Sequence, residues 1–131
     1  MMPAPVRVII ATRYTLFREG VKTMLQQGRA IEVIGEAGTA KQAVSLVERL
    51  RPDVVLLDPA LPDLRGEEAV RRLRTADARV KIFLIPLGDG LPIRAPHLRS
   101  QVAGHIDKHD RLIDLRSALL HSVHRRGAHA A

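Results

Sequence analysis

Short apolar runs alternate with amphipathic stretches along nearly the whole chain. The apolar runs are rich in Val, Ile and Leu, as is typical of buried strands, and they cover Val6–Ala11, Ile31–Ala37, Val54–Leu57, Val80–Ile85 and a shorter stretch around His105–Ile106. Between these runs, apolar residues recur every three or four positions, which predicts helices over residues 15–27, 39–50, 64–74 and 110–124.

Residues with a preference for helix ends support these boundaries. Thr15 is expected to cap the first helix, and Thr39-Ala40-Lys41-Gln42 has the form of a capping box that opens the second. Gly28 is expected to stop the first helix, and Arg51-Pro52 the second. Asp110 is expected to cap the last helix.

The segment from Leu87 to Gln101 is the least regular part of the pattern. Pro86 precedes it, and Pro92 and Pro96 lie within it. Because a proline inside a helix costs ~3 kcal/mol, any helix in this segment is expected to be short or irregular and to begin at or beyond Pro96.

Strands and helices therefore alternate as five βα units. This order predicts an α/β fold with a doubly wound parallel sheet, helices on both faces and right-handed crossovers. The 131 residues are enough for one domain with a real core. We expect that domain to span residues 1–124, and residues 125–131 to form a tail or the start of a linker.

Composition narrows the functional classes. The net charge of +7 could indicate a nucleic-acid partner, but the basic residues are scattered and aromatic residues make up only 2% of the chain. We therefore expect no direct contact between this domain and nucleic acid. The chain has no cysteine, no apolar run of membrane-spanning length and no signal-peptide pattern, so we expect a cytoplasmic protein without disulfides.

Asp58 is the main candidate for chemistry. It follows directly on the apolar run Val54–Leu57 and precedes a loop bounded by Pro59 and Pro62. In open α/β sheets, ligands bind at the carboxyl ends of the strands, which is where this carboxylate is expected to lie.

Six segments resemble the receiver domain of bacterial response regulators, in order and spacing: VRVIIA, LFREGV, IEVIGEAG, RPDVVLLD, ALPDLRGEEAVRRLR and VAGHIDK. They are most similar to the branch in which a helix-turn-helix DNA-binding domain follows the receiver. The resemblance implies a flavodoxin-like (βα)5 fold with strand order 2-1-3-4-5. It also implies a role in transcription regulation within a two-component system, with a C-terminal DNA-binding domain as partner if the full-length protein contains one.

The resemblance assigns roles to particular positions. Asp58 matches the aspartate that accepts the phosphoryl group, and Lys108 matches the family's lysine. The acidic pair that helps to hold Mg²⁺ falls on Thr12 and Arg13, and the hydroxyl at the end of strand 4 falls on Pro86. The strand-5 aromatic that normally moves with this hydroxyl falls on His105. Asp58 and Lys108 thus keep the family's phosphorylation residues, whereas Thr12, Arg13 and Pro86 replace them.

These losses oppose phosphoryl transfer. Mg²⁺ prefers carboxylate oxygens in octahedral array, and a cation at position 13 repels it by ~4 kcal/mol per charge pair at 4 Å in an intermediate dielectric. We therefore expect Mg²⁺ binding to be lost, no cofactor and no enzymatic activity. The resulting hypothesis is an atypical receiver that acts by protein–protein contact, largely independently of phosphorylation. The alternative is a phospho-accepting receiver that uses Asp58.

Two further hypotheses concern the role of the pocket around Asp58 in a receiver that is not phosphorylated. Asp58 could form a structural ion pair with Arg13 or Lys108. Alternatively, Thr12, Arg13 and Thr15 at a helix N-terminus could bind an anionic small molecule. A stand-alone binding protein for such a ligand is a third functional class, on fold analogy alone.

The last helix offers a candidate output face. Family receivers form dimers through helix 4, strand 5 and helix 5, or through helices 1 and 5, and we expect a homodimer here. The residues expected on this face are Leu112, Ile113, Arg116 and Leu120. His121 and His124 have a spacing that can ligate metal, but no third ligand is close in sequence, so no metal site is expected.

Overall fold

The computed structural model describes residues 4–85, 101–106 and 111–130. Five parallel strands form one sheet in the order β2-β1-β3-β4-β5, which confirms the predicted flavodoxin-like topology. The strands are β1 (Val6–Ala11), β2 (Ile31–Ala37), β3 (Val54–Leu57), β4 (Lys81–Leu84) and β5 (Gly104–His105). The helices are α1 (Thr15–Leu25), α2 (Ala40–Leu50), α3 (Gly66–Ala76) and α5 (Leu112–Ala130). The predicted irregular segment 87–101, apart from Gln101, and the predicted cap Asp110 lie outside the described residues.

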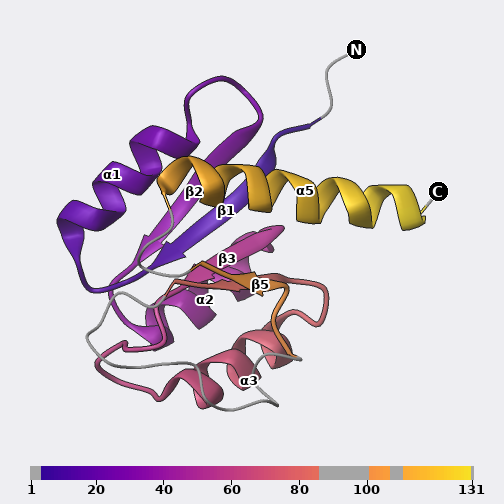
Figure 1. Cartoon of the computed structure of the whole chain (residues 1–131). Helices are drawn as coiled ribbons and strands as arrows, with labels where there is room; N and C mark the ends of the chain where they lie inside the picture. Colours follow the sequence, from indigo (N-terminus) through magenta and orange to yellow (C-terminus); the bar gives the residue numbers. More distant parts are fainter. Residues whose placement is uncertain (1–3, 86–100, 107–110, 131) are drawn as a thin grey trace.

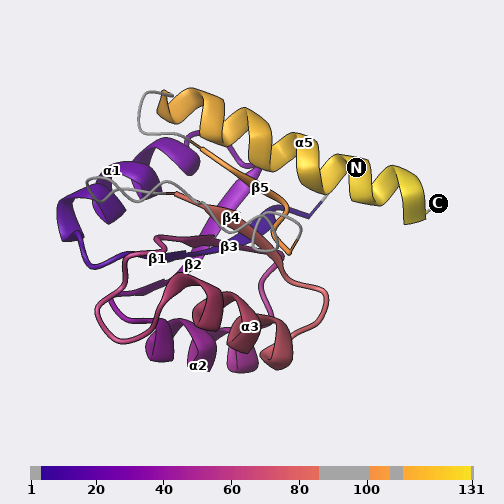
Figure 2. The same cartoon turned by 60° about the horizontal axis from the view of Figure 1, so that its bottom comes forward.

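The helices cover both faces of the sheet. Helices α1 and α5 lie on one face, whereas α2 and α3 lie side by side on the other (Figures 1 and 2). Such a three-layer arrangement explains why the strands are apolar without interruption, since both of their faces are covered.

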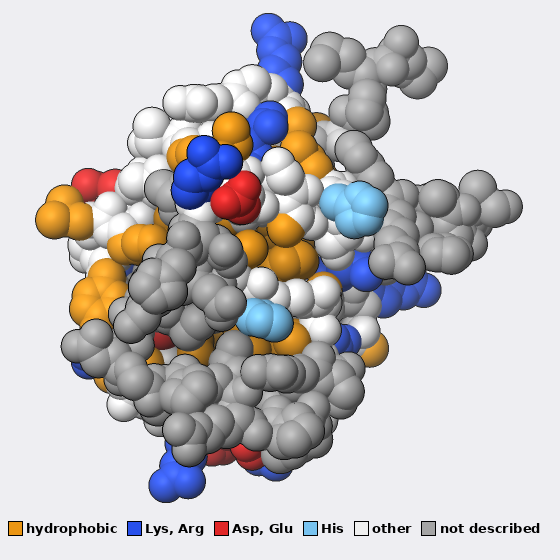
Figure 3. Space-filling model, viewed as in Figure 1, with side chains coloured by type: hydrophobic (Ala, Val, Ile, Leu, Met, Phe, Trp, Pro, Cys, Tyr) orange, Lys and Arg blue, Asp and Glu red, His pale blue; other side chains and the backbone are white. Residues whose placement is uncertain are grey.

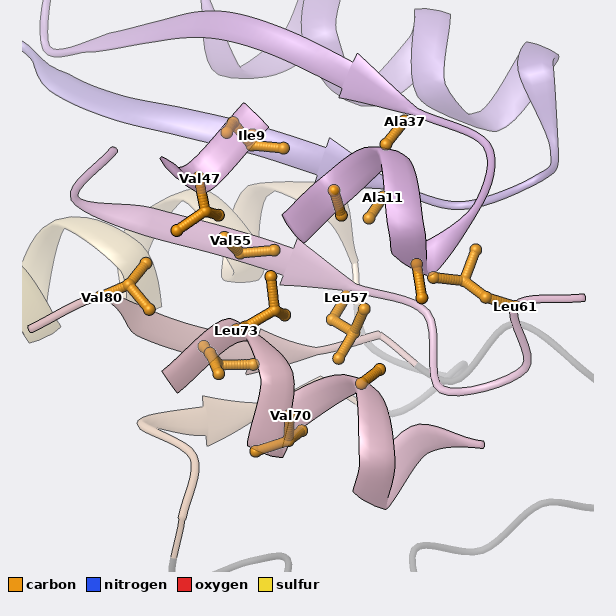
Figure 4. Packing of buried hydrophobic residues seen from close by; sticks show 14 of the residues in the cluster. Ile9, Ala11, Ala37, Val47, Val55, Leu57, Leu61, Val70, Leu73 and Val80 are labelled. Atoms are coloured by element: carbon orange, nitrogen blue, oxygen red, sulfur yellow. The ribbon is translucent and has the colours of Figure 1, made fainter. Parts of the chain in front are cut away.

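Successive apolar residues of β1, β3 and β4 contribute to different apolar clusters. On β3, Val55 and Leu57 point toward α2 and α3, and Val54 and Leu56 point toward α1 and α5. Figure 4 shows the first of these clusters, in which residues of β1 and β3 pack against Val47 of α2 and residues of α3. The alternation follows from the two-residue period of a strand. It gives the domain two cores separated by the sheet.

Local signals mark both ends of α2 and the turn after α1. The hydroxyl of Thr39 accepts a 3.1 Å hydrogen bond from the backbone N–H of Gln42, as predicted for the start of α2. The side chain of Gln42 accepts from the backbone N–H of Gly38, not of Thr39, so the capping box is incomplete. Arg51 ends α2 in the left-handed region, with φ of 45°. Gly28 follows α1 with φ of 83°, a conformation in which glycine has no Cβ penalty.

Several predicted boundaries were wrong, including the end of α1, which lies at Leu25 and not at residue 27. Tyr14, not Thr15, is the N-cap of α1, because the Thr15 hydroxyl lies within the helix and accepts a 3.4 Å hydrogen bond from Arg18. Helix α3 runs over Gly66–Ala76, not 64–74, since the loop after Asp58 occupies the two preceding positions. Helix α5 continues to Ala130, past the expected end at residue 124. Its last residues include Arg and Ala, which favour helix, and a single glycine costs only about 1 kcal/mol there.

Candidate functional site

Asp58 lies immediately after β3, at the carboxyl ends of the strands. Its backbone N–H donates a 2.9 Å hydrogen bond to the carbonyl of Ala11, so the β1–β3 ladder continues up to this residue. The side chain is completely buried. A buried carboxylate is costly unless hydrogen-bond donors surround it, so its partners define the site.

Among the described residues, two donors contact the Asp58 carboxylate. The hydroxyl of Thr12 donates to Oδ2 at 3.0 Å, and the backbone N–H of Ala60 donates to Oδ1 at 2.9 Å. Thr12 is also fully buried, and its hydroxyl oxygen accepts a 3.3 Å hydrogen bond from the backbone N–H of Tyr14. The carboxylate is thus held by the end of β1 on one side and by the loop after β3 on the other.

Arg13 lies at the site but turns toward solvent. Its guanidinium donates a 3.1 Å hydrogen bond to the Tyr14 hydroxyl, and its Cζ lies 5.1 Å from the centre of the Tyr14 ring. The hydrogen bond to Tyr14 holds the pKa of Arg13 above its ordinary value, and the charge of Asp58 contributes in the same direction. Arg13 therefore acts on Asp58 through the electric field, and not by the direct contact considered from the sequence. The other expected cation, Lys108, and the position Pro86 lie outside the described residues.

Arg18 of α1 is a member of the site that sequence reasoning missed. Its guanidinium donates to the backbone carbonyl of Thr12, and its Nε lies 3.4 Å from Oε1 of Glu36 on β2. Lys22, one turn later, lies 3.6 Å from the other oxygen of Glu36. Arg18 therefore ties the turn that carries Thr12 to the neighbouring strand. No period or motif in the sequence marks this contact.

Asp63 fixes the far end of the loop that begins at Asp58. Its Oδ1 and Oδ2 accept hydrogen bonds of 2.8 and 2.9 Å from the backbone N–H groups of Ala40 and Lys41, in the first turn of α2. Desolvation raises the pKa of the Asp63 carboxyl, but these two N–H donors and the charge of Lys41 outweigh it and leave the pKa below its ordinary value. Sequence reasoning missed this role too, because the capping residue comes from a distant loop.

The donor set around Asp58 does not fit Mg²⁺. The family's magnesium site uses several carboxylates, whereas the acidic-pair positions here hold Thr12 and Arg13, and both oxygens of Asp58 accept hydrogen bonds from described residues. Within the described ranges, no group of three or more His, Asp or Glu side chains could hold a metal ion. No step through a metal is therefore assigned to this site.

The other expected site residues divide between surface and core. In the predicted anion site, Arg13 and Thr15 are exposed, but the Thr12 hydroxyl is buried and bonded to Asp58. On the predicted output face, Ile113 is 57% exposed, whereas Leu120 packs against the core beneath α5. Arg116 reaches the carbonyl of Gln27 at 3.4 Å. The side chain of Leu112 is outside the described set.

Basic residues are dispersed on the face seen in Figure 3. Lys and Arg side chains lie there at several separate places around apolar and neutral surface, and do not form one continuous patch. In the part of the chain that the structure describes, no helix is both long and apolar enough to cross a membrane.

The sequence of this chain is similar to those of known response regulators. The family model of the response regulator receiver domain matches residues 8–120. The response regulator UvrY from Escherichia coli (strain K12) is 30% identical over 103 residues, which cover 79% of this chain and 47% of UvrY. A protein of Mycobacterium tuberculosis named "probable transcriptional regulatory protein NarL" is 30% identical over 118 residues, which cover 90% of this chain and 55% of that protein.

Solved structures agree with these sequence relationships. The receiver domain of NarL from Mycobacterium tuberculosis superimposes with a TM-score of 0.76 at 29% identity, covering 90% of this chain and 95% of that one. A LuxR-family response regulator from Aurantimonas gives a TM-score of 0.77 at 25% identity, covering 88% of this chain and 85% of that one. The chain spans about half the length of the curated relatives it matches.

Proposed function

This chain belongs to the response regulator receiver domain family, and from that premise we propose that it is an atypical receiver of a transcriptional regulator that works largely without phosphorylation of Asp58. In this proposal it is a signalling module and not an enzyme. The observation that carries the proposal is the buried hydrogen bond of 3.0 Å between Thr12 and Asp58.

The environment of Asp58 opposes phosphoryl transfer in two ways. Without a divalent cation, an anionic donor would have to approach an anionic carboxylate with no metal to neutralise the developing charge. In addition, the oxygen that would attack phosphorus is buried and already accepts a hydrogen bond. Removing one of these donors would leave a buried acceptor unsatisfied, which costs about 1–3 kcal/mol.

Output in this proposal depends on contact with other proteins. The UvrY and NarL relatives are named as regulators and are about twice as long as the matched region, so we propose that a C-terminal DNA-binding domain follows this receiver in the full-length protein. We also propose a homodimer through α5. Its support is Ile113, a large apolar side chain that is more than half exposed on that helix.

The decisive experiment is incubation of the 131-residue chain with acetyl phosphate and Mg²⁺, followed by intact-mass measurement. We expect no species heavier by one phosphoryl group. A substantial phosphorylated fraction that disappears in Asp58→Asn would contradict the proposal and support the phospho-accepting alternative.

A gain-of-function variant makes the negative result informative. The double substitution Thr12→Asp and Arg13→Asp restores two carboxylates beside Asp58. Because three carboxylates crowd together in that variant, Mg²⁺ should raise its thermal midpoint by mass action, whereas the parent should not respond. Arg29→Asp, at an exposed position in the loop after α1, changes charge away from the site and serves as the control. A rise in the thermal midpoint of the parent with Mg²⁺ that is as large as the rise in the double variant would show that the native site already binds the ion.

A further inference from the structure

A concave site lies at the amino ends of the strands, opposite the end of the sheet that carries Asp58. It is a hollow of about 400 Å³ between the end of α3, the start of β4 and the segment that leads into β5. The segment before β5 runs beside the end of α3 in Figure 1. Six residues line the hollow: Arg74, Arg79, Val80, Lys81, Val102 and Ala103. Its volume is within the range of small-ligand pockets.

The lining combines three basic residues with three small apolar ones. Arg74, Arg79 and Lys81 supply three cations, and none of the six lining residues is acidic. The other three are small apolar residues, of which Val80 is almost completely buried. Like charges held around one hollow repel each other, and this repulsion decreases when an anion enters.

Arg74 is held in position for binding. Its Nε donates a 2.8 Å hydrogen bond to the backbone carbonyl of Gln101, and a second guanidinium nitrogen donates to the same oxygen. Guanidinium has five N–H donors, so this anchoring leaves others for a ligand. Its planar fork suits the paired oxygens of a phosphate group.

Two acidic residues of the described ranges lie next to the lining residues in sequence or on the neighbouring strand, and both bind backbone groups. Asp77 ends α3, and its Oδ1 accepts a 3.0 Å hydrogen bond from the backbone N–H of Arg79. Asp53 precedes β3, and its Oδ2 accepts a 2.8 Å hydrogen bond from the backbone N–H of Arg7. Both carboxylates thus serve the backbone, and neither is part of the lining.

We infer that this hollow binds a small molecule that carries two or more phosphate groups. A phosphate group carries about 1.5–2 negative charges at neutral pH, so two of them match three cations better than a single carboxylate does. The inference does not depend on the function proposed for the Asp58 site, because the two sites share no residue. Such a ligand would bridge α3 and β4 and so give the domain an input separate from Asp58.

The test is calorimetric titration of the 131-residue chain with sodium pyrophosphate at physiological ionic strength. We expect binding, and we expect the double variant Arg79→Gln, Lys81→Gln to raise the Kd about tenfold or more. The control Arg49→Gln, on the exposed surface of α2, removes a charge outside the hollow and should leave the Kd within about twofold because distant surface charges are screened.

Several outcomes would overturn the inference. No heat with pyrophosphate at millimolar concentration would exclude the site, and equal weakening by Arg49→Gln would reduce it to general attraction by a basic protein. Citrate that binds as tightly as pyrophosphate would refute the preference for phosphate. As a control for folding, the thermal midpoints of the variants should equal that of the parent, so that a weaker binding of pyrophosphate is caused by the lost charges and not by unfolding.

Discussion

The hydroxyl of Thr12 donates a 3.0 Å hydrogen bond to Oδ2 of Asp58, and both side chains are completely buried. The backbone register produces this pairing. Ala11 and Leu57 are partners in the parallel β1–β3 ladder, so the next residue of each strand lies at the same level. A threonine hydroxyl is short enough to remain inside and satisfy the carboxylate.

Replacing Thr12 by Val should destabilise the domain. Valine has nearly the same shape but no hydroxyl, so Asp58 would lose the Thr12 donor in a buried setting, at a cost of about 1–3 kcal/mol. Urea unfolding measures the difference. Thr12→Ser, which keeps the hydroxyl, is the matched control, and a Val variant as stable as the Ser variant would show that the hydrogen bond contributes little.

Replacing Asp63 by Ala should weaken the start of α2. Two N–H groups would lose their acceptor, with an expected loss of about 0.5–2 kcal/mol in the free energy of unfolding. Glu48→Ala, on the exposed surface of the same helix, should have little effect.

The contribution of Asp63 should also depend on pH. Its pKa is lowered in the folded state, so this contribution is complete above the unfolded pKa of about 3.9 and is lost as pH falls from there through the lower folded value. The stability difference between the parent and Asp63→Ala should therefore shrink below about pH 4. A difference that stays constant through the acid range would argue against the capping role of the ionised carboxylate.

Gly104 should not tolerate a side chain. A Cβ at this position would lie 2.6 Å from Cε1 of Phe83 on the neighbouring strand β4, and that ring is buried against the core. Gly104→Ala should cost about 1–3 kcal/mol through overpacking, measured by thermal unfolding. A second substitution, Phe83→Leu, should recover part of the loss.

Gly20 provides the control for that experiment. It lies in α1, and a Cβ added there would meet no atom within 4 Å outside the helix's own neighbouring backbone, so Gly20→Ala should raise stability by about 1 kcal/mol through helix propensity. If both alanine variants shifted the thermal midpoint in the same direction, the contact with Phe83 would not be the cause.

Ile113→Asp should abolish self-association if α5 forms the proposed dimer. The substitution places a charge on an apolar side chain that is 57% exposed, and burying this charge in an interface would be costly. Sedimentation velocity at micromolar and higher concentrations measures the change. Arg49→Asp, on the exposed surface of α2 and therefore on the opposite face of the sheet, should leave the dimer intact. A monomeric parent would remove the basis for this prediction.

The sheet could be predicted from the sequence because its strands are buried on both faces. Runs such as Val54–Leu57 have no polar interruption, and their alternation with amphipathic helices leaves few topologies. Helix ends were less certain. Thr15 has a good capping side chain, but Tyr14 takes the N-cap position. Local preference does not determine which of two neighbouring residues leaves the helical conformation.

The site was predictable in its position and less so in its contacts. Sequence and resemblance brought Thr12, Arg13 and Asp58 together, and Arg13 or Lys108, of which the latter lies outside the described residues, was the expected ion-pair partner of Asp58. The structure shows the threonine as the hydrogen-bonding partner, whereas the neighbouring arginine pairs with Tyr14. The contacts of Arg18 and Asp63 depend on how helices and loops pack across the sheet, and residue spacing carries no signal for that.

Capping from a distance gives the loop after Asp58 a mechanical role. One end of the loop is attached to the Asp58 carboxylate through Ala60, and the other end holds the first turn of α2 through Asp63. These hydrogen bonds therefore couple the position of the loop to the first turn of the helix. An outward swing of the loop would leave two amide groups of α2 exposed, and unwinding of that first turn would in turn release the loop.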